Sequence, residues 1–274
     1  MFKCIDFDEK YSEFVSKWME ANKGKYRNFD AMEADLPRVY TVFLNTPAPW
    51  LDGLTPGSYF SQYEDPKDLV DWMVDYCVQG VPVPDQLLEQ IQFVGKPCEK
   101  RLMNLLKDDT ASQDARMTAI GLLRDMDSTQ PKMLYIGWQL EREQDDELAD
   151  NALDSLAAMG KSVVQQLLDA LPRANDAGQE ALLDILVNYS QDDRVYRATM
   201  RLFTKTVQRR ALFASYLAKL GDSRALPELM AAANDPACSY CDFIELRNAI
   251  EVLGGEAPDR DFSEDPDYEA IHDL

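Results

Sequence analysis

Two cysteines have the most recognisable chemical spacing in this sequence. Cys238 and Cys241 stand in "CSYCDF", which is the spacing of half a zinc knuckle or of a redox couple, at a predicted helix start that would favour a thiolate. Their complement is missing, because Cys4, Cys77 and Cys98 are scattered along the chain. We therefore expect reduced, unreactive thiols, with no metal site and no cofactor.

Histidine chemistry has little support in the composition. The single histidine, His272, lies close to the end of the chain, where a catalytic base would have to be held in place by its surroundings. No glycine-rich phosphate loop is present either, since "GLTPGS" lacks the lysine and the following helix that such a loop requires. The sequence predicts no catalytic residue.

A group of basic residues contrasts with an acidic background. Residues 194 to 210 contain no acidic residue, and the basic residues among them, called the basic stripe below, are Arg194, Arg197, Arg201, Lys205, Arg209 and Arg210. The first four are spaced 3, 4 and 4, so they fall within about 80° of one helix face. Two interpretations remain open. The stripe is either a solvated face with salt bridges to acids such as Asp192 and Asp193, or a site for an anionic segment.

The second interpretation has a chemical basis, because guanidinium groups match carboxylates and phosphates in bidentate geometry. The anionic segment could come from a partner or from this chain's own acidic end, with Phe262 or Tyr268 as an apolar anchor.

A loop rich in proline, glycine and aromatic residues precedes residue 65. In "TPAPWLDGLTPGSYFSQYEDP", Trp50, Tyr59 and Phe60 either cover the open end of a helical core or line an aromatic ligand pocket. Both alternatives stay open, although aromatic side chains more often pack than bind.

Apolar patterns typical of helices recur along the chain, and we expect these helices to carry the residues above. Apolar triplets at i, i+4 and i+7, each one buried helix stripe, occur five times. The triplets are Ala119, Leu123, Met126; Ala152, Leu156, Met159; Leu182, Leu186, Tyr189; Phe213, Leu217, Leu220; and Leu246, Ile250, Leu253. Their first members lie 33, 30, 31 and 33 residues apart, a period typical of stacked repeats.

A second short apolar helix precedes each triplet, as in "PKMLYIGWQL" and "RALPELMAAA". Gly160, Gly221 and Gly254 fit helix ends that need a left-handed residue. Strand patterns are missing from residues 96 to 255. Each unit is therefore a helical hairpin, and the sequence predicts an all-α fold.

These residues also carry a family resemblance. "YLAKLGDSRALPELMAAANDP" followed by "ELRNAIEVLGG" resembles the HEAT-like repeats first described in phycobilisome lyases, which read A-L-G-x-L-G-D-x-R-A-L-P-x-L followed by an Arg-x-x-A helix. The match is strong over residues 206 to 255 and weak over 112 to 190, where Asp127 and Ser190 replace the glycine. No pigment-specific motif is visible, so bilin-lyase activity is not carried over.

The resemblance and the period together imply an α-solenoid, an α-α superhelix of stacked HEAT-like helical hairpins. The hairpins would occupy residues 65 to 255, behind a helical, aromatic-rich N-terminal cap at residues 1 to 64. Residues 256 to 274 would form an acidic C-terminal tail, with little burial except around Phe262, Tyr268 and Ile271.

The charge balance restricts the partners. The 274 residues include 28 basic and 49 acidic ones, for a net charge of -21, which repels nucleic-acid phosphates and anionic membranes. No apolar run approaches the roughly 18 residues of a membrane span, and the N-terminus lacks a signal pattern. We expect a cytoplasmic protein that binds proteins or peptides.

The favoured function is a non-catalytic scaffold that binds a protein segment on a curved helical surface. The alternative is a HEAT-like enzyme or enzyme subunit. It would resemble either the HEAT-like alkylpurine DNA glycosylases, for which the basic stripe would be the DNA groove, or a lyase-like subunit for a cofactor-bearing protein.

Overall fold

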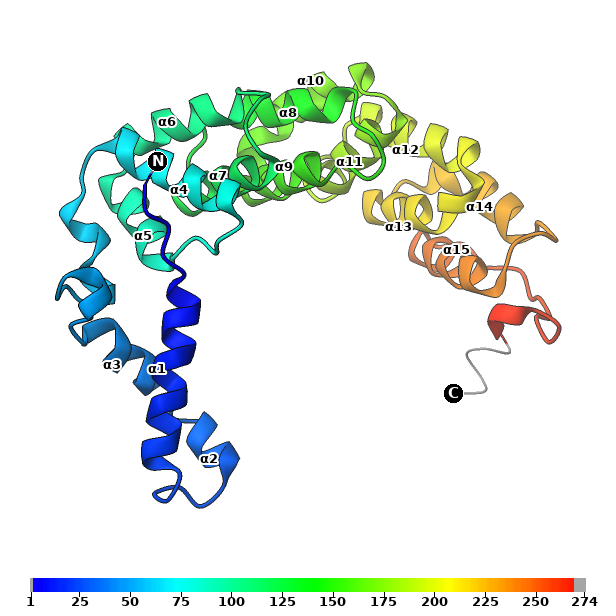
Figure 1. Ribbon diagram of the computed structural model, residues 1–274. Helices are drawn as coiled ribbons and strands as arrows, with labels where there is room; N and C mark the ends of the chain where they lie inside the picture. Colours follow the sequence, from blue (N-terminus) through cyan, green and yellow to red (C-terminus); the bar gives the residue numbers. More distant parts are fainter. Residues whose placement is uncertain (1, 269–274) are drawn as a thin grey trace. The chain divides into compact units, whose positions relative to one another are not determined.

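The computed structural model describes residues 2 to 268, and all regular structure among them is helical (Figure 1). This confirms the predicted all-α class. The internal contacts divide the chain into two compact units, Met1–Pro131 and Lys132–Leu274. The boundary between these units, after Pro131, does not coincide with a boundary of the expected segments. The expected division into residues 1 to 64, 65 to 255 and 256 to 274 stays a prediction.

The first unit consists of helices and short 3-10 turns. Its helices are α1 (Phe7–Asn22), α2 (Phe29–Glu33), α3 (Leu36–Asn45), α4 (Pro66–Gln79), α5 (Asp85–Val94), α6 (Lys96–Leu106) and α7 (Gln113–Asp125), and its turns are η1 (Pro49–Leu51), η2 (Pro56–Ser58) and η3 (Phe60–Gln62). Helix α1 packs against α3, while α4 packs against α5, α6 and α7.

The second unit consists of helices in consecutive pairs. They are α8 (Lys132–Leu140), α9 (Glu147–Ala158), α10 (Val164–Ala170), α11 (Asp176–Leu186), α12 (Asp193–Lys205), α13 (Arg210–Leu220), α14 (Leu226–Ala233) and α15 (Tyr240–Val252), with the turns η4 (Gly160–Val163), η5 (Leu171–Arg173), η6 (Val207–Arg209) and η7 (Ser223–Ala225). Each pair, from α8 with α9 to α14 with α15, is in contact, and α13 also packs along α15.

Local capping explains where several helices begin. The sequence "DPKDLV" predicts Asp65 as an N-cap with Pro66 at the first helical position. The structure confirms this, because the Asp65 side chain accepts hydrogen bonds from the N–H groups of Lys67 and Asp68 and α4 begins at Pro66. The segment "DEKYSEFVSKWMEAN" predicts a helix with Asp8 as its N-cap, and that cap is wrong by two residues. The Asp6 side chain caps α1 by accepting from the N–H of Glu9.

Left-handed residues end four of the helices at corresponding places. Gly160, Gly221 and Gly254 have φ values of 57°, 69° and 83°, as their positions predict. Asp127 takes the same conformation, with φ 52°, at the place where the resemblance expects glycine. Ser190, the other replacement, is not among the residues with positive φ.

The first two members of every apolar triplet face the core, whereas most of the third members do not. Those ten side chains are at most 1% exposed. Among the third members only Leu220 is buried, while Tyr189 is 42% exposed. The reason is that Tyr189 lies beyond the end of α11 at Leu186, where the helical period no longer sets the direction of the side chain.

One close approach sets the packing of α11 on α8. Gly178 lies so near α8 that a Cβ atom there would stand 1.9 Å from the backbone oxygen of Gln139. Asn175, the N-cap of α11, holds the same junction, because its N–H donates to the Leu140 oxygen at 2.7 Å and its side-chain amide to the Arg142 oxygen at 2.9 Å.

The described part of the expected acidic tail packs on the last hairpin. Phe262 is 7% exposed, with its ring 4.8 Å from that of Phe243 and 5.4 Å from that of Tyr240. The Arg260 guanidinium donates to the backbone oxygens of Ala233 and Asp235. Phe262 is therefore not free to anchor on the basic stripe. Ile271 and His272 lie outside the described residues.

Candidate binding site

Helix α12 carries the first four residues of the basic stripe. It begins at the N-cap Asp192, and Val195, Thr199 and Leu202 form its buried face. Arg209 lies in η6 and Arg210 begins α13. The helix face predicted from the spacing is present.

Each residue of the stripe has a carboxylate partner. Arg194 pairs with Asp169 and Asp192, Arg197 with Asp193, Arg201 and Lys205 with Asp176, Arg209 with Glu180, and Arg210 with Asp235. The bonds from Lys205 and Arg201 hold the pKa of Asp176 below its usual range. These contacts favour the salt-bridged interpretation. Binding of an anion at the stripe stays a prediction, and such an anion would have to compete with Asp176 and Glu180.

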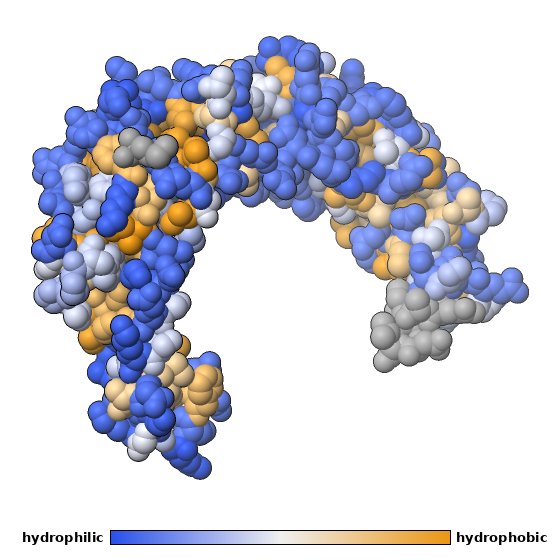
Figure 2. All heavy atoms as spheres, viewed as in Figure 1, coloured by the Kyte–Doolittle hydropathy of each residue, from blue (hydrophilic) through white to orange (hydrophobic). Residues whose placement is uncertain are grey.

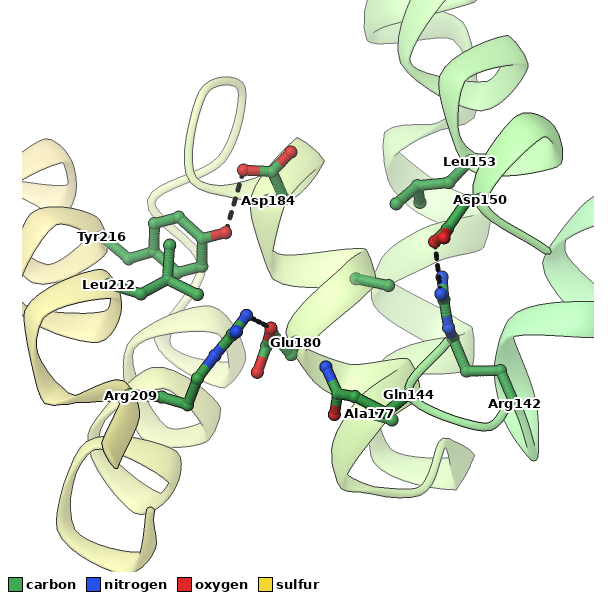
Figure 3. A pocket seen from close by; sticks show the side chains of 11 residues that line it. Arg142, Gln144, Asp150, Leu153, Ala177, Glu180, Asp184, Arg209, Leu212 and Tyr216 are labelled. Carbon is green, nitrogen blue, oxygen red and sulfur yellow. Dashed lines mark hydrogen bonds and ion pairs between the residues drawn. The ribbon is translucent and has the colours of Figure 1, made fainter. Parts of the chain in front are cut away.

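A groove opens beside these ion pairs in the second unit (Figure 3), and we call it the three-helix groove. It has a volume of about 270 Å³. Its lining comes from three helices and the segments before them: Arg142, Gln144, Asp150 and Leu153 from the α9 region, Ala177, Glu180, Ala181 and Asp184 from α11, and Arg209, Leu212 and Tyr216 from the α13 region.

Arg142 forms a fixed wall of this groove. It is only 6% exposed, and its guanidinium donates to Gln139 Oε1 at 2.9 Å and to a carboxylate oxygen of Asp150. Gln139, which is fully buried, donates in turn to the backbone oxygen of Ala149 at 2.9 Å. A buried charge with paired, hydrogen-bonded neighbours keeps one geometry.

Asp184 and Tyr216 form the other polar pair, and Figure 3 shows the phenol turned toward the carboxylate. The Tyr216 hydroxyl donates to Asp184 Oδ1 at 2.9 Å. Burial and this bond raise the pKa of Tyr216 above its usual range, so the phenol stays neutral and remains a donor.

More acidic than basic side chains line the groove. Asp150 is paired with Arg142 and Glu180 with Arg209. Asp184 is exposed, and among residues 2 to 268 no Lys or Arg forms a salt bridge with it. A cationic side chain that entered the groove would find an uncompensated carboxylate beside the apolar surfaces of Leu153 and Leu212.

Of the three aromatic residues proposed for a pocket, Trp50 lines a cavity to which Tyr59 and Phe60 do not contribute, and a shared pocket stays a prediction. Phe60 is 1% exposed, and its ring lies 4.9 Å from that of Trp72, while the Tyr59 ring lies 5.8 Å from it. Burial raises the pKa of Tyr59 to about 12. Trp50 meets Phe7 edge-on at 5.3 Å and borders a different cavity, described below.

The N-terminal segment is bound closely to α4, as a cap would be. Ile5 N–H donates to the Tyr76 hydroxyl, which donates back to the Ile5 oxygen, both at 3.1 Å. Phe2 N–H donates to Asp75, and the Phe2 ring stacks on Trp72 with centroids 5.0 Å apart. These contacts are the kind that a cap requires, and the cap itself stays a prediction.

The two cysteines of the C-x-x-C spacing lie at the start of α15. Cys238 is buried just before the N-cap Ser239, and Cys241 is exposed in the first turn. The pKa values of both thiols are raised, chiefly by desolvation, which favours the protonated and less reactive form. Within residues 2 to 268 no group of three or more metal-ligating side chains comes together. No helix in that range has the length and apolar composition to cross a membrane.

Apart from Arg209, the residues of the three-helix groove were not predicted from the sequence. The only signal for them is the repeat period, because the pairs Glu180 with Arg209 and Asp184 with Tyr216 join residues 29 and 32 apart. These separations are close to the predicted period of 30 to 33 residues.

No protein-family model, curated protein or solved structure matches this chain.

Proposed function

We propose that this chain is a HEAT-like repeat scaffold, a non-catalytic protein that binds a basic segment of a partner protein in the three-helix groove. The observation that carries the proposal is which helices line the groove. The second helices of three successive hairpins, α9, α11 and α13, contribute side chains to one binding surface. Stacked repeats use the same helix of each pair in this way.

Two features of the helices support the repeat itself. Paired helices alternate along the second unit, and contacts such as those of α8 with α11 and α13 with α15 join neighbouring pairs. The left-handed residues Asp127 and Gly160 are 33 residues apart, and so are Gly221 and Gly254. A common backbone conformation at a common spacing supports a common structural unit. A continuous superhelix over residues 65 to 255 belongs to this proposal.

The charge of the groove supports a basic partner. Asp184 offers a carboxylate with which no Lys or Arg of residues 2 to 268 forms a salt bridge, and the net charge of -21 attracts positively charged segments during encounter. Most of the surface seen in Figure 2 is hydrophilic, with smaller hydrophobic patches.

The glycosylase-like alternative has less support, since phosphates would have to displace Asp176 and Glu180 from the basic stripe.

The test compares two charge reversals of equal size. Asp184→Lys changes the groove, whereas Glu245→Lys changes an exposed position on α15 that does not line it. The probe is a labelled synthetic peptide with alternating leucine and arginine, and fluorescence anisotropy gives its affinity for the full chain.

We expect Asp184→Lys to weaken binding at least tenfold, which is about 1.4 kcal/mol, while Glu245→Lys changes it less than threefold. Equal weakening by both variants would mean unspecific attraction to an acidic protein and would reject the groove. Affinity capture with the parent and the Asp184→Lys chain, followed by mass spectrometry, then identifies the partner.

A further inference from the structure

A second cavity lies in the first unit, between α1, the end of α3 and the loop that follows. Its volume of about 380 Å³ falls in the range of small-molecule sites. Phe14, Phe43 and Trp50 line it, together with Ala48 and the three prolines of residues 47 to 56. Most of this lining is apolar, as in pockets that bind an apolar ligand body.

The wall of the cavity is held in place before any ligand arrives. The Phe14 and Phe43 rings lie 5.5 Å apart, and Phe7 supports Trp50 from the core. The loop closes on itself through the Ala48 N–H, which donates to the Leu54 oxygen at 2.9 Å. A preformed wall lowers the entropic cost of binding.

The loop also lies close against α3. A Cβ atom at Gly57 would stand 2.9 Å from the backbone oxygen of Leu44, so the loop approaches the helix as closely as a glycine allows.

All charged side chains that line the cavity come from one helix. Lys10, Glu13 and Lys17 follow each other on α1 at i, i+3 and i+7, which places them on one face. Lys10 Nζ bonds Glu13 at 2.8 Å and lowers the pKa of that carboxyl. Lys17 has no salt-bridge partner in residues 2 to 268, so the cavity carries a net positive charge in a chain whose net charge is -21.

We propose that this cavity binds a small amphipathic monocarboxylate, such as a medium-chain fatty acid. Its apolar body would pack against Phe14, Phe43 and Trp50, and its carboxylate would meet the ammonium group of Lys17. A neutral apolar ligand would leave the ammonium group unused, and a bare inorganic anion would leave the aromatic wall unused. The site lies in a different unit from the three-helix groove and does not depend on the proposed scaffold function.

The test uses the full chain and isothermal titration calorimetry with hexanoate, octanoate and decanoate. Octanamide, which has the same chain and no charge, is the matched neutral ligand. We expect one saturable site whose affinity rises about fourfold per methylene, and a preference of about two- to fivefold for octanoate over octanamide.

Three variants assign the site to its residues. Lys17→Gln should reduce the preference for octanoate over octanamide to about one, while Lys23→Gln, at the C-cap of the same helix, should keep it. Thr46→Trp places a large side chain at an exposed position of the lining and should weaken both ligands at least tenfold. Circular dichroism checks that each variant keeps its helices.

The proposal is overturned if octanoate shows no saturable binding up to millimolar concentration, or if octanamide binds the parent chain as tightly. It is also overturned if the preference for the carboxylate survives Lys17→Gln, or if Thr46→Trp leaves the affinity of octanoate unchanged.

Discussion

Replacing Gly178 by alanine should destabilise the second unit, although alanine is the better helix former. Gly178 lies inside α11, where the substitution by itself would stabilise a helix by about 1 kcal/mol. The added Cβ, however, would stand 1.9 Å from the backbone oxygen of Gln139 and 3.1 Å from Ala174 Cβ. The oxygen belongs to a helix backbone and cannot rotate away, so α11 has to move from α8.

The size of the effect follows from what that movement disturbs. Overpacking of a close-packed contact costs about 1 to 3 kcal/mol, and more where backbone must shift. The same shift strains the two hydrogen bonds of Asn175 to the Leu140 and Arg142 oxygens, each worth about 1 kcal/mol. After subtraction of the helix-propensity gain, we expect the free energy of unfolding to fall by about 2 to 4 kcal/mol.

Thermal unfolding followed by circular dichroism measures this change against a matched control. Gly137→Ala makes the same substitution within α8, where a Cβ atom would meet nothing within 4 Å. We expect its midpoint to stay or to rise, whereas that of Gly178→Ala should fall by roughly 4 to 16 °C. If the two variants melt alike, the close approach of α11 to α8 is wrong.

Two further predictions concern the core and the ion pairs. Leu217→Asp places a carboxylate at a fully buried position of α13 and should abolish the cooperative fold. The control Lys219→Asp changes an exposed position of the same helix and should keep the fold. Gel filtration and circular dichroism measure both outcomes. Lys205 and Arg201 lower the pKa of Asp176 in the folded state. The ionised carboxylate therefore stabilises the fold at pH values above the ordinary carboxyl pKa, and this stabilisation is lost as the pH falls through the lowered pKa of the folded state. Removing both partners as Arg201→Gln and Lys205→Gln should raise the Asp176 pKa toward its ordinary value in an NMR titration, and an unmoved pKa would contradict the pairing.

The aromatic residues before residue 65 show how far a local pattern reaches. Their clustering in the sequence correctly marks a region of dense packing, since Tyr59 and Phe60 both lie against Trp72. A shared pocket for all three residues stays a prediction. The path of the loop through η1, η2 and η3 brings Trp50 to the cavity beside α1, and Tyr59 and Phe60 are not part of that lining. Prolines restrict such a path locally, but contacts with distant helices select it.

The helices and several of their ends follow from local patterns of residues. Asp65 and Gly221 act on backbone groups within a few residues, so capping and left-handed conformation can be read from neighbours in the chain. The helical period likewise placed Leu156 and Leu217 in the core.

The partners of the polar residues depend on how whole helices pack, which no local pattern shows. The basic stripe was visible as a helix face, but its neutralisation depends on Asp176 and Glu180 of the preceding hairpin. The same holds for Asp184 and Tyr216, which are 32 residues apart and meet because α13 lies beside the face of α11 that carries Asp184. The physical reason is that an ion pair or hydrogen bond requires atoms to approach within about 3 to 4 Å, and the packing of whole helices sets that distance.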